Sequence, residues 1–557
     1  MLYSELVKVY QELEKTTKRL EKTDIIADFI KKISKENLSK IIYLLEGRIF
    51  PEWDDRKIGF STRLMIKALA TCSGRTSDDV EKLFTKKGDL GDAALELLDK
   101  KTQRTLTSKN ITVDKVVLNI HKLADLEGEG TVNKKLSYVT ELLVHANKEE
   151  ARYIVKTILE ELRVGTASGV MRDSISKAFD RDVKDVEKSS DLLADFGEVA
   201  LLAKENKLNK VSLKPGRPLK LMLALLSKNI QESFESLGKK VQIEEKIDGF
   251  RVEVHKYGDN IRLFTRNLEE VTNQFPDVVS IIKEKVKGEN FILDCEVVGI
   301  DKKTRKHTPF QSISQRIRRK HDIEKMAKDF PVEISVFDLI FYNDKSLMDK
   351  NLMERRKLLE KIVKESKRKI VLTKKLVTNS IEKAEKFYDE SLKKGMEGVM
   401  VKNLDSKYRP GRYVNGWVKL KNILDPLDLV IVKAEFGEGK RTKWLSSYTV
   451  ACKNGDEYLE LGKVSTGVKE KTEGLTYNEM TKLLKPLIKK QKGKEVIVKP
   501  KIIIEVGYEE IQKSTNYNSG FALRFPRVHF LRMDKPLSEV NDLNTVEKIY
   551  KIQRGER

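Results

Sequence analysis

The chain has 557 residues, of which 109 are Lys or Arg and 86 are Asp or Glu, so its formal net charge is +23. This length predicts about three or four domains, and the charge favours nucleic acid as a partner, with a lysine-rich surface adapted to heat as the alternative. Three scattered cysteines, six unclustered histidines and the lack of a long apolar run argue against disulfides, zinc and a membrane span, so we expect a soluble intracellular protein.

The first part of the chain, residues 1–208, has the periodicity of helices. Apolar residues recur at i, i+3, i+4 and i+7 from Leu6 to Leu13, which places them on one helix face. A second amphipathic pattern predicts a helix over 148–162, and Gly165 is expected to end it. Alternating patterns are scarce here, so the region is predicted to be an all-α domain.

The character of the sequence changes after this helical part. Two prolines in residues 213–219 predict an extended connector. Alternating apolar residues on both sides of Gly258–Asn260 predict a hairpin, and the apolar runs at 291–298 and 334–340 predict short strands. With helices expected between the strands, residues 209–423 are predicted to form an α+β domain.

The last part, residues 424–557, is expected to be rich in strands. The runs 428–432 and 448–451 have strand composition, and Asn454-Gly455 is a strong hairpin signal. Short strands with tight turns in ~130 residues are typical of a small barrel, and an OB-fold is the natural choice for a protein that acts on nucleic acid. We therefore predict a C-terminal β-barrel of the OB type.

The run Glu244–Arg251 carries the clearest chemical signal. Lys246 is followed by Asp248 and Gly249, and a glycine there would let the backbone approach a phosphate. Only a neutral amine is a nucleophile, and ~0.1% of ordinary lysine is neutral near pH 7.4. A second cation such as Arg251 favours loss of the proton. Taken alone, the run is equally well explained as a surface turn.

This run resembles motif I of the covalent nucleotidyltransferases, the superfamily of DNA ligases, RNA ligases and mRNA capping enzymes. Further matches follow in the order of that family. The resemblance implies that Lys246 becomes adenylylated and that other residues contact the nucleotide. The expected contacts are Glu244 with the adenine amino group, Arg251 and Arg266 with ribose or phosphate, Phe337 stacked on adenine, and Glu296 with the ribose.

The same resemblance implies a metal site and a phosphate site. Glu296 and Glu397 would bind the metal, which suits Mg²⁺, with Mn²⁺ as the alternative. Lys419 and Lys421 would bind the α-phosphate, and their alternation places both on one face of a strand. Each residue alone could equally be strand core, a strand-end charge or a solvated edge.

One position departs from the family pattern. Relatives often carry an arginine a few residues before the Trp417 motif, but an ungapped alignment places Tyr413 there. Arg412 is its neighbour, so we expect Arg412 to contact the nucleotide.

The two ends of the chain narrow the resemblance to DNA ligases. Residues 519–528 and 532–536 resemble motif VI of cellular and archaeal DNA ligases, and 437–441 and 462–467 resemble the barrel of that family. This likeness implies a set of residues that orient the leaving pyrophosphate. The set is Arg524, Arg527 and Lys535. A basic strand that contacts the DNA backbone is the compatible alternative.

The helical N-terminal part also favours DNA ligases over RNA ligases and capping enzymes. Residues 150–165 resemble the DNA-binding domain of archaeal and eukaryotic replicative ligases, which small RNA ligases and capping enzymes are not expected to carry. Three scattered cysteines also cannot supply the four-cysteine zinc module of NAD-dependent ligases. Some ligases of this type bind a sliding clamp through a Gln-led segment, and 103–107 lies in the corresponding neighbourhood but lacks its aromatic anchors.

The chain is thus identified as a member of the ATP-dependent DNA ligases of the archaeal/eukaryotic replicative type. The resemblance implies a monomer that uses ATP and Mg²⁺ to seal nicks in double-stranded DNA during replication, repair and recombination. An RNA-joining or capping nucleotidyltransferase is the nearest alternative. A non-catalytic DNA-binding scaffold is the alternative of another class, which the intact Lys246, Glu296, Glu397 and Lys419 disfavour.

Overall fold

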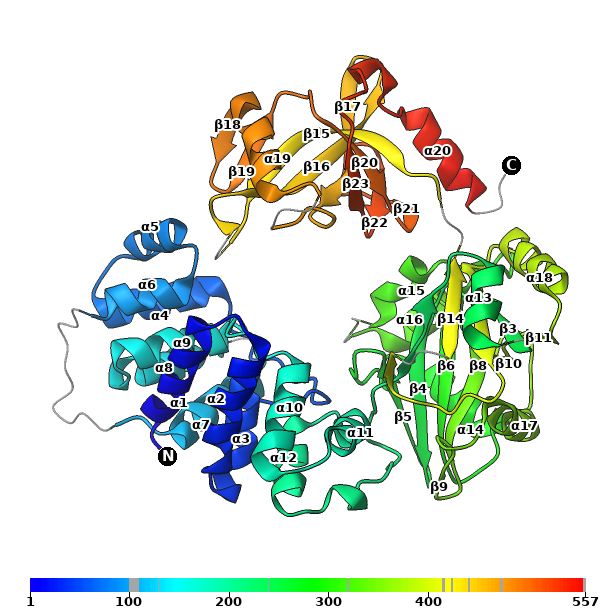
Figure 1. The fold of residues 1–557 in the computed structure, drawn as a ribbon, viewed down its shortest axis with the longest axis horizontal. Coiled ribbons are helices and arrows are strands. Elements are labelled where there is room, and N and C mark those ends of the chain that lie inside the picture. The colour runs from blue at the N-terminus through cyan, green and yellow to red at the C-terminus, as the bar shows by residue number, and fades with distance from the viewer. Residues whose placement is uncertain are drawn as a thin grey trace. The chain divides into compact units, whose positions relative to one another are not determined.

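The chain divides into two units in the computed structural model (Figure 1). The model describes residues 1–99, 110–128, 130–238, 240–317, 319, 321–412, 416–421, 424–438, 441–470 and 474–553. The first unit contains residues 1–81, 90–391 and 396–420, and the second contains 82–89, 392–395 and 421–557. Each unit is described by itself below.

The N-terminal part of the chain is helical, as predicted. Its helices are α1 (Tyr3–Lys15), α2 (Arg19–Lys31), α3 (Lys35–Leu45), α4 (Thr62–Ser73), α5 (Ser77–Lys87), α6 (Leu90–Leu97), α7 (Val113–Asp125), α8 (Val132–His145), α9 (Lys148–Ile158), α10 (Ser168–Phe179), α11 (Val183–Leu193) and α12 (Phe196–Lys204), followed by the short 3-10 helix η1 (Leu208–Lys210). The apolar face predicted between Leu6 and Leu13 is buried along α1. Among the helices of the described residues, none is long and apolar enough to cross a membrane.

The predicted end of α9 is wrong. The helix starts at a capping box formed by Asn147 and Glu150, and it ends at Ile158, before the predicted 162. Gly165 lies in the following loop with φ +80°, where an added Cβ would overlap the ammonium of Lys22. The glycine is therefore explained by this close approach and by its left-handed backbone, and not by the end of a helix.

The middle part of the chain is built around two sheets. The β3 sheet has the order β11-β3-β12-β14-β2, and the β6 sheet has the order β10-β8-β6-β4-β5 with β7 and β9 attached to β6 and β8. The strands of the β3 sheet are β2 (Leu225–Leu226), β3 (Val241–Lys246), β11 (Lys375–Thr378), β12 (Gly398–Asn403) and β14 (Trp417–Lys421). Those of the β6 sheet are β4 (Phe250–Tyr257), β5 (Asn260–Thr265), β6 (Asn290–Ile300), β7 (His307–Thr308), β8 (Val332–Tyr342), β9 (Lys345–Ser346) and β10 (Ile370–Leu372).

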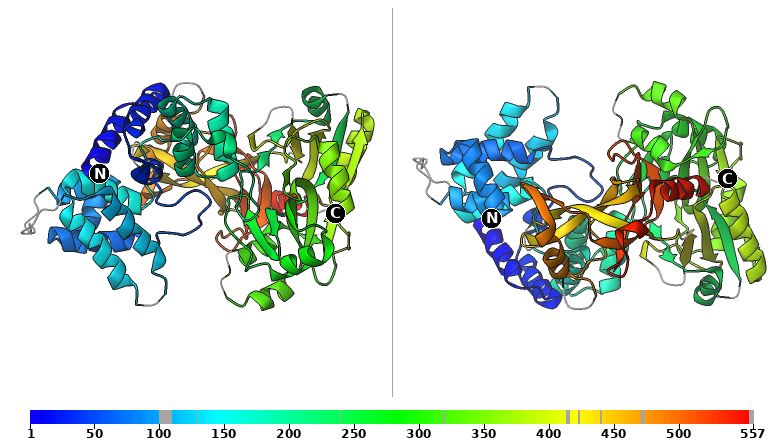
Figure 2. Two further views of the ribbon diagram at one scale, coloured as in Figure 1. Left: turned by 90° about the horizontal axis from the view of Figure 1, so that it is seen from below. Right: turned by 90° about the horizontal axis from the view of Figure 1, so that it is seen from above.

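Helices pack against the two sheets (Figure 2). On the β3 sheet, α13 (Ile230–Leu237) and α18 (Ile381–Lys393) bury residues such as Phe234 and Phe387 against Val399. On the β6 sheet the covering helices include α14 (Pro276–Lys285), α15 (Phe310–Ile317) and α17 (Leu352–Ile362), and α16 (Ile323–Asp329) follows α15. A small pair of β1 (Met222–Leu223) and β13 (Gly411–Arg412) completes this part. The α+β prediction is confirmed.

The second unit contains a strand-rich, OB-like domain. Its strands are β15 (Leu427–Phe436), β16 (Leu445–Asn454), β17 (Glu457–Val464), β18 (Ile488–Lys492), β19 (Glu495–Val498), β20 (Ile503–Gly507), β21 (Glu510–Lys513), β22 (Phe521–Arg524) and β23 (Arg527–Leu531). The other elements are α19 (Tyr477–Leu484), α20 (Leu543–Ile552) and the 3-10 helices η3 (Lys485–Leu487) and η4 (Leu537–Glu539).

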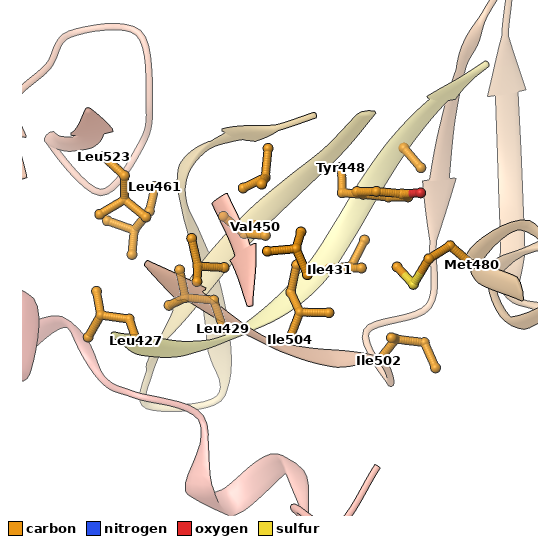
Figure 3. Packing of buried hydrophobic residues seen from close by; sticks show 14 of the residues in the cluster. Leu427, Leu429, Ile431, Tyr448, Val450, Leu461, Met480, Ile502, Ile504 and Leu523 are labelled. Carbon is orange, nitrogen blue, oxygen red and sulfur yellow. The ribbon is translucent and has the colours of Figure 1, made fainter. Parts of the chain in front are cut away.

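The core of this domain lies between its strands and α19. Alternate residues such as Leu429, Ile431 and Val450 point inward together and pack with Met480 of the helix (Figure 3). The strand order of its main sheet is β17-β16-β15-β19-β18. In addition, β20 pairs with β15 and with β23. Gly455 forms the predicted hairpin turn between β16 and β17 with φ +59°. The predicted C-terminal fold class is confirmed.

Candidate active site

Lys246 lies at one end of the β3 sheet, where β3 ends beside the start of β12. It is the last residue of β3, and Glu397 immediately precedes β12, which runs antiparallel to β3. The amide of Glu397 donates to the carbonyl oxygen of Lys246 at 2.9 Å, and the Lys246 ammonium forms an ion pair with the Glu397 carboxylate. Their side chains are 21% and 26% exposed, so the amine is held in place and still accessible.

Glu296 contributes a second carboxylate from the β6 sheet. It lies on β6 opposite Arg251 of β4. Burial raises the pKa of Glu296 to about 8; Lys246 and Arg251 oppose this shift, whereas Glu397 adds to it by like-charge repulsion. Glu296 therefore lies within electrostatic reach of both Lys246 and Glu397, although the two sheets are separate.

The two carboxylates have the chemistry of a magnesium site. Hard oxygen ligands suit Mg²⁺, which keeps several waters and is often held by one or two protein carboxylates. Within the described residues no group of three or more His, Cys, Asp or Glu could hold a metal ion. Glu296 and Glu397 repel each other in a buried place, and a divalent cation between them would relieve that repulsion. The residues present thus fit the metal.

Arg251 is held in place by partners on β6 and β1. Its guanidinium makes two bonds to Asp294, at 2.8 and 2.6 Å, and donates to the carbonyl oxygen of Met222 at 2.7 Å. Burial lowers the pKa of Arg251, but Asp294 raises it by more, so the side chain stays charged. The guanidinium carbon lies 5.4 Å from the ring centroid of Phe337. Arg251 therefore links the backbone near β1 to the aromatic residue of the site.

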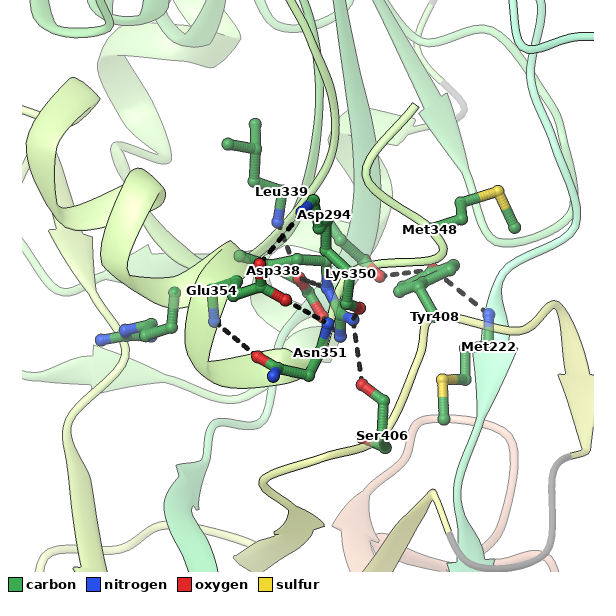
Figure 4. A network of polar contacts seen from close by, with 12 residues as sticks. Met222, Asp294, Asp338, Leu339, Met348, Lys350, Asn351, Glu354, Ser406 and Tyr408 are labelled. Atoms are coloured by element: carbon green, nitrogen blue, oxygen red, sulfur yellow. Dashed lines mark hydrogen bonds and ion pairs between the residues drawn. The ribbon is translucent and has the colours of Figure 1, made fainter. Parts of the chain in front are cut away.

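A network of polar contacts holds this region together (Figure 4). The hydroxyl of Tyr408 donates to Asp294 at 2.8 Å and accepts from the amide of Met222 at 3.2 Å. Asp338, next to Phe337, binds Arg355 at 2.7 and 2.9 Å, and both side chains are fully buried. These partners had no role in the sequence prediction, because their function depends on which strands lie side by side.

Glu244 and Phe337 lie on the two sheets and share a neighbour. Glu244 is buried on β3, where Lys402 of β12 approaches its carboxylate to 2.6 Å. The Lys402 ammonium also lies 4.8 Å from the ring centroid of Phe337 on β8 and 4.3 Å from that of Trp417 on β14. Phe337 and Trp417 meet edge to face with centroids 6.2 Å apart. The predicted base-reading carboxylate and base-stacking ring are thus brought to one place, and Lys402 joins them.

Gly249 is required by a close approach within the protein that the sequence did not predict. A Cβ at this position would overlap the carbonyl oxygen of Val297 on β6 and come within 3.0 Å of the Cγ of Glu296. The close approach that requires glycine is therefore between the end of the Lys246 loop and β6. By this contact the loop and Glu296 are held next to each other.

The remaining residues predicted to contact the nucleotide are less informative. Arg266 follows β5 and is exposed. Arg412 lies on β13 with its Cα paired with Leu223, and its side chain lies outside the described part of the chain. Lys419 is half-buried on β14, between the buried Val418 and Leu420. Lys421 ends that strand with the same intermediate exposure, as the predicted alternation requires.

The predicted pyrophosphate residues belong to the second unit. Arg524 ends β22 and lies 3.3 Å from Glu510, whereas Arg527 begins β23 and is exposed. The Lys535 ammonium lies 2.6 Å from the carboxylate of Asp428. The segment 103–107, considered for clamp binding, and residues 439–440 of the 437–441 match lie outside the described residues.

Comparison with known proteins finds the same family along most of the chain. The family described as "ATP dependent DNA ligase domain" matches residues 221–421. "DNA ligase N terminus" matches residues 2–176, and "ATP dependent DNA ligase C terminal region" matches 441–535. The solved structure "Pmar-Lig_PreS3" has a TM-score of 0.60 at 17% identity and covers 95% of this chain and 99% of its own, which is a likeness of fold.

Relatives that align over the full length share a higher sequence identity with this chain than that solved structure does. The DNA ligase of Nanoarchaeum equitans is 46% identical over an alignment that covers 100% of this chain and 99% of that protein. The DNA ligase of Thermococcus onnurineus is 40% identical, with 99% of this chain and 98% of that protein covered. With such identity over the whole length, and with three matching domain families in the same order, this chain belongs to the ATP-dependent DNA ligase family.

Proposed function

We propose that Lys246 is the residue that takes AMP from ATP and that this protein passes the AMP to nicked double-stranded DNA. One observation carries the proposal: the Lys246 amine is held by Glu397 at a place that Glu296 also reaches from the opposite sheet. An amine next to carboxylates, in a domain that also presents the partly exposed ring of Phe337 against Trp417, suits attack on a bound purine nucleotide.

The first step forms a bond between Lys246 Nζ and the α-phosphorus of ATP. The bond from that phosphorus to pyrophosphate breaks, and the amine loses a proton. In the second step an oxygen of the DNA 5′-phosphate attacks the AMP phosphorus, and the nitrogen–phosphorus bond breaks. In the third step the 3′-hydroxyl oxygen attacks the 5′-phosphorus, loses its proton, and AMP leaves. All three steps are displacements at phosphorus, so one set of cations can serve each of them.

The other predicted residues have supporting roles in this proposal. Glu244 reads the adenine amino group, Phe337 stacks on the base, and Arg251, Arg266 and Arg412 contact ribose or phosphate. Lys419 and Lys421 stabilise the charge that develops on the α-phosphate. Glu296 and Glu397 would hold Mg²⁺, with Mn²⁺ as the alternative, and the bound metal would act as a Lewis acid toward the phosphate oxygens. In the second unit Arg524, Arg527 and Lys535 orient the pyrophosphate.

The substrate and the domain boundaries form a second part of the proposal. The net charge of +23 and the match to the N-terminal region of DNA ligases support contact with the DNA backbone. We propose domains at 1–208, 209–423 and 424–557, because helices give way to strands after η1 and a new set of strands begins at β15. The protein acts as an intracellular, DNA-associated monomer in replication, repair and recombination, and a sliding clamp is its proposed further partner.

The chemistry is tested by incubating the protein with α-labelled ATP and Mg²⁺ and separating it on a denaturing gel. We expect covalent label on the wild-type protein and transfer of that label on addition of nicked DNA. A nicked RNA duplex run in parallel separates DNA joining from RNA joining. If the wild type takes up no label, the proposed mechanism is wrong.

DNA binding is tested by its dependence on salt. Contacts to several phosphates predict a loss of affinity of about 10³-fold or more between 50 and 200 mM salt. A binding constant that does not change over this range would contradict contacts made mainly to phosphates.

A further inference from the structure

The carboxylate of Glu244 is held on both of its oxygens. Glu244 is 1% exposed. The side-chain amide of Gln242 donates to Oε1 at 2.6 Å, and the ammonium of Lys402 lies 2.6 Å from Oε2. The strand register explains this arrangement, because Gln242 faces Lys402 across β3 and β12 and Glu244 faces Met400. Glu244 and Lys402 are therefore diagonal neighbours on one face of the sheet.

Lys402 is as buried as its partner. It is 1% exposed, and its ammonium lies against the rings of Trp417 and Phe337 at 4.3 and 4.8 Å from their centroids. A buried ammonium without an anion is costly, and so is a buried carboxylate without a cation. Arg356 adds a second cation, with Nη1 3.8 Å from Glu244 Oε1. Glu244 and Lys402 thus form a buried ion pair in which each charge compensates the other.

The charge on Glu244 determines what it can bind. An ionised carboxylate only accepts hydrogen bonds, whereas a protonated one also donates. A purine with an amino group at position 6 offers a donor to this carboxylate, and a purine with an oxygen there offers a second acceptor. A buried acceptor that faces another acceptor loses its hydrogen bond and is also repelled.

We propose that Lys402 is a positioning residue for base selection, which holds Glu244 as a fixed, ionised acceptor so that the site takes 6-aminopurine and rejects 6-oxopurine nucleotides. This inference rests on the proposed function, in which Glu244 faces the base. Lys402 itself acts through Glu244. A site built around a buried polar group discriminates strongly against a ligand that leaves it unpaired, so we expect ATP to be preferred over inosine triphosphate by about 10³-fold or more.

The experiment compares the binding of ATP and inosine triphosphate to the full chain. Calorimetry without divalent metal measures both affinities in the absence of phosphoryl transfer. The main variant is the double substitution Glu244→Gln with Lys402→Met, which removes both charges together and so leaves neither one buried and unpaired. A glutamine amide both donates and accepts, so we expect the preference for ATP to fall to about tenfold or less.

Two single variants sharpen the result. Lys402→Arg keeps a cation next to Glu244, and we expect it to retain most of the preference for ATP. Lys156→Met is the matched control, because Lys156 is another buried lysine, on α9, that pairs with Asp92 at 3.4 Å. We expect this control to lower the melting temperature without changing the ratio of the two affinities.

The possible results separate this inference from the proposed function. A folded double variant that keeps the wild-type preference overturns the role of Lys402 and Glu244, as does a wild type that binds both nucleotides equally. If the wild type prefers ATP, the double variant loses that preference and no label reaches the protein, base selection stands and the proposed chemistry fails. If the wild type is labelled and the double variant still prefers ATP, the chemistry stands and the inference fails.

Discussion

The site around Lys246 and the basic segment from Arg524 to Lys535 differ in how their charged partners are brought together. Around Lys246, residues from two separate sheets meet through strand register, and the carboxylates of Glu296 and Glu397 lie within electrostatic reach of the same amine. In the second unit, Arg524 and Lys535 are instead paired with acidic residues of their own domain, Glu510 and Asp428. Arg527 is exposed.

The two regions therefore differ in how far their side chains must rearrange before they bind a ligand. The Lys246 site is built into the strands, so its side chains need little rearrangement to meet a nucleotide. Arg524 and Lys535 must first leave Glu510 and Asp428 to bind a pyrophosphate, and release of such partly exposed ion pairs costs about 1 kcal/mol or less. We therefore expect large, specific effects from substitutions in the first region and small, adjustable ones in the second.

The largest effect is expected for Lys246→Ala. Removal of a nucleophile leaves no route to the covalent protein, so the rate of nick sealing should fall by at least about 10⁴-fold. Gel assays with end-labelled nicked DNA measure this rate. Lys256→Ala is the control, because Lys256 lies on β4, the next strand in the chain, and donates to the backbone carbonyl of Gly288. Label that persists on Lys246→Ala would place the nucleophile elsewhere.

The next largest effect is expected for Asp294→Asn, which breaks the buried pair with Arg251. Loss of one partner of a buried pair lowers the free energy of unfolding by about 3–5 kcal/mol. Since Arg251 also supports Phe337, the apparent affinity for ATP should fall by about 10-fold or more, a loss of ~1.4 kcal/mol. Unfolding in urea and nucleotide binding measure the two effects.

The pair of Arg316 and Asp277 provides the matched control for that result. Arg316 is fully buried and lies 2.6 Å from Asp277, between α15 and α14 and not among the predicted site residues. Asp277→Asn should lower stability and leave ATP affinity unchanged. If both variants reduce affinity equally, the Asp294 effect is one of stability alone.

A smaller effect on stability is expected for Gly249→Ala. The added methyl group would overlap the backbone of Val297, and overpacking of this kind costs about 1–3 kcal/mol. Because the same contact holds Glu296 near Lys246, label uptake should also decrease. Gly169→Ala is the control, since its Cβ would meet only the end of the flexible Arg19 side chain, at 3.2 Å. Equal melting temperatures for Gly249→Ala and the wild type would contradict the packing argument.

The smallest effect is expected for Asp428→Asn in the second unit. This change frees Lys535 from its 2.6 Å ion pair. If Lys535 orients pyrophosphate, the rate of label uptake should rise by about twofold to fivefold, the equivalent of less than ~1 kcal/mol. Lys535→Ala should lower the same rate. Rapid-quench measurements at saturating ATP compare them, and a slower, fully folded Asp428→Asn would argue against the competition between Asp428 and pyrophosphate.

The fold class could be predicted from short-range patterns, whereas the set of residues around Lys246 was predicted from the resemblance to the covalent nucleotidyltransferases. Alternation with a period of two identified the strands, and the order of the motifs placed Glu296, Phe337 and Glu397 with Lys246. In the structure Lys246 of β3 pairs with Glu397 next to β12, and Glu296 of β6 lies within electrostatic range of both.

The supporting residues could not be predicted in the same way. Gln242 and Lys402 matter because of their cross-strand register with Glu244 and its neighbours, and Tyr408 matters because its loop reaches Asp294. The signal for Lys402 was a lysine at the end of an otherwise apolar strand, but burial was needed to interpret it. The helix end predicted at Gly165 was wrong and the packing of Gly249 against β6 was not predicted for a related reason, since each glycine is required by a close approach from a distant part of the chain.

The most direct test of the central claim is to locate the covalent AMP on the protein. The wild type is incubated with ATP and Mg²⁺, digested under conditions that preserve the nitrogen–phosphorus bond, and mapped by mass spectrometry. We expect one AMP on the peptide that contains Lys246, and none on that peptide after treatment with pyrophosphate, which reverses the first step. AMP attached to another lysine, or an unmodified Lys246 peptide in a protein that seals nicks, would contradict the role of Lys246.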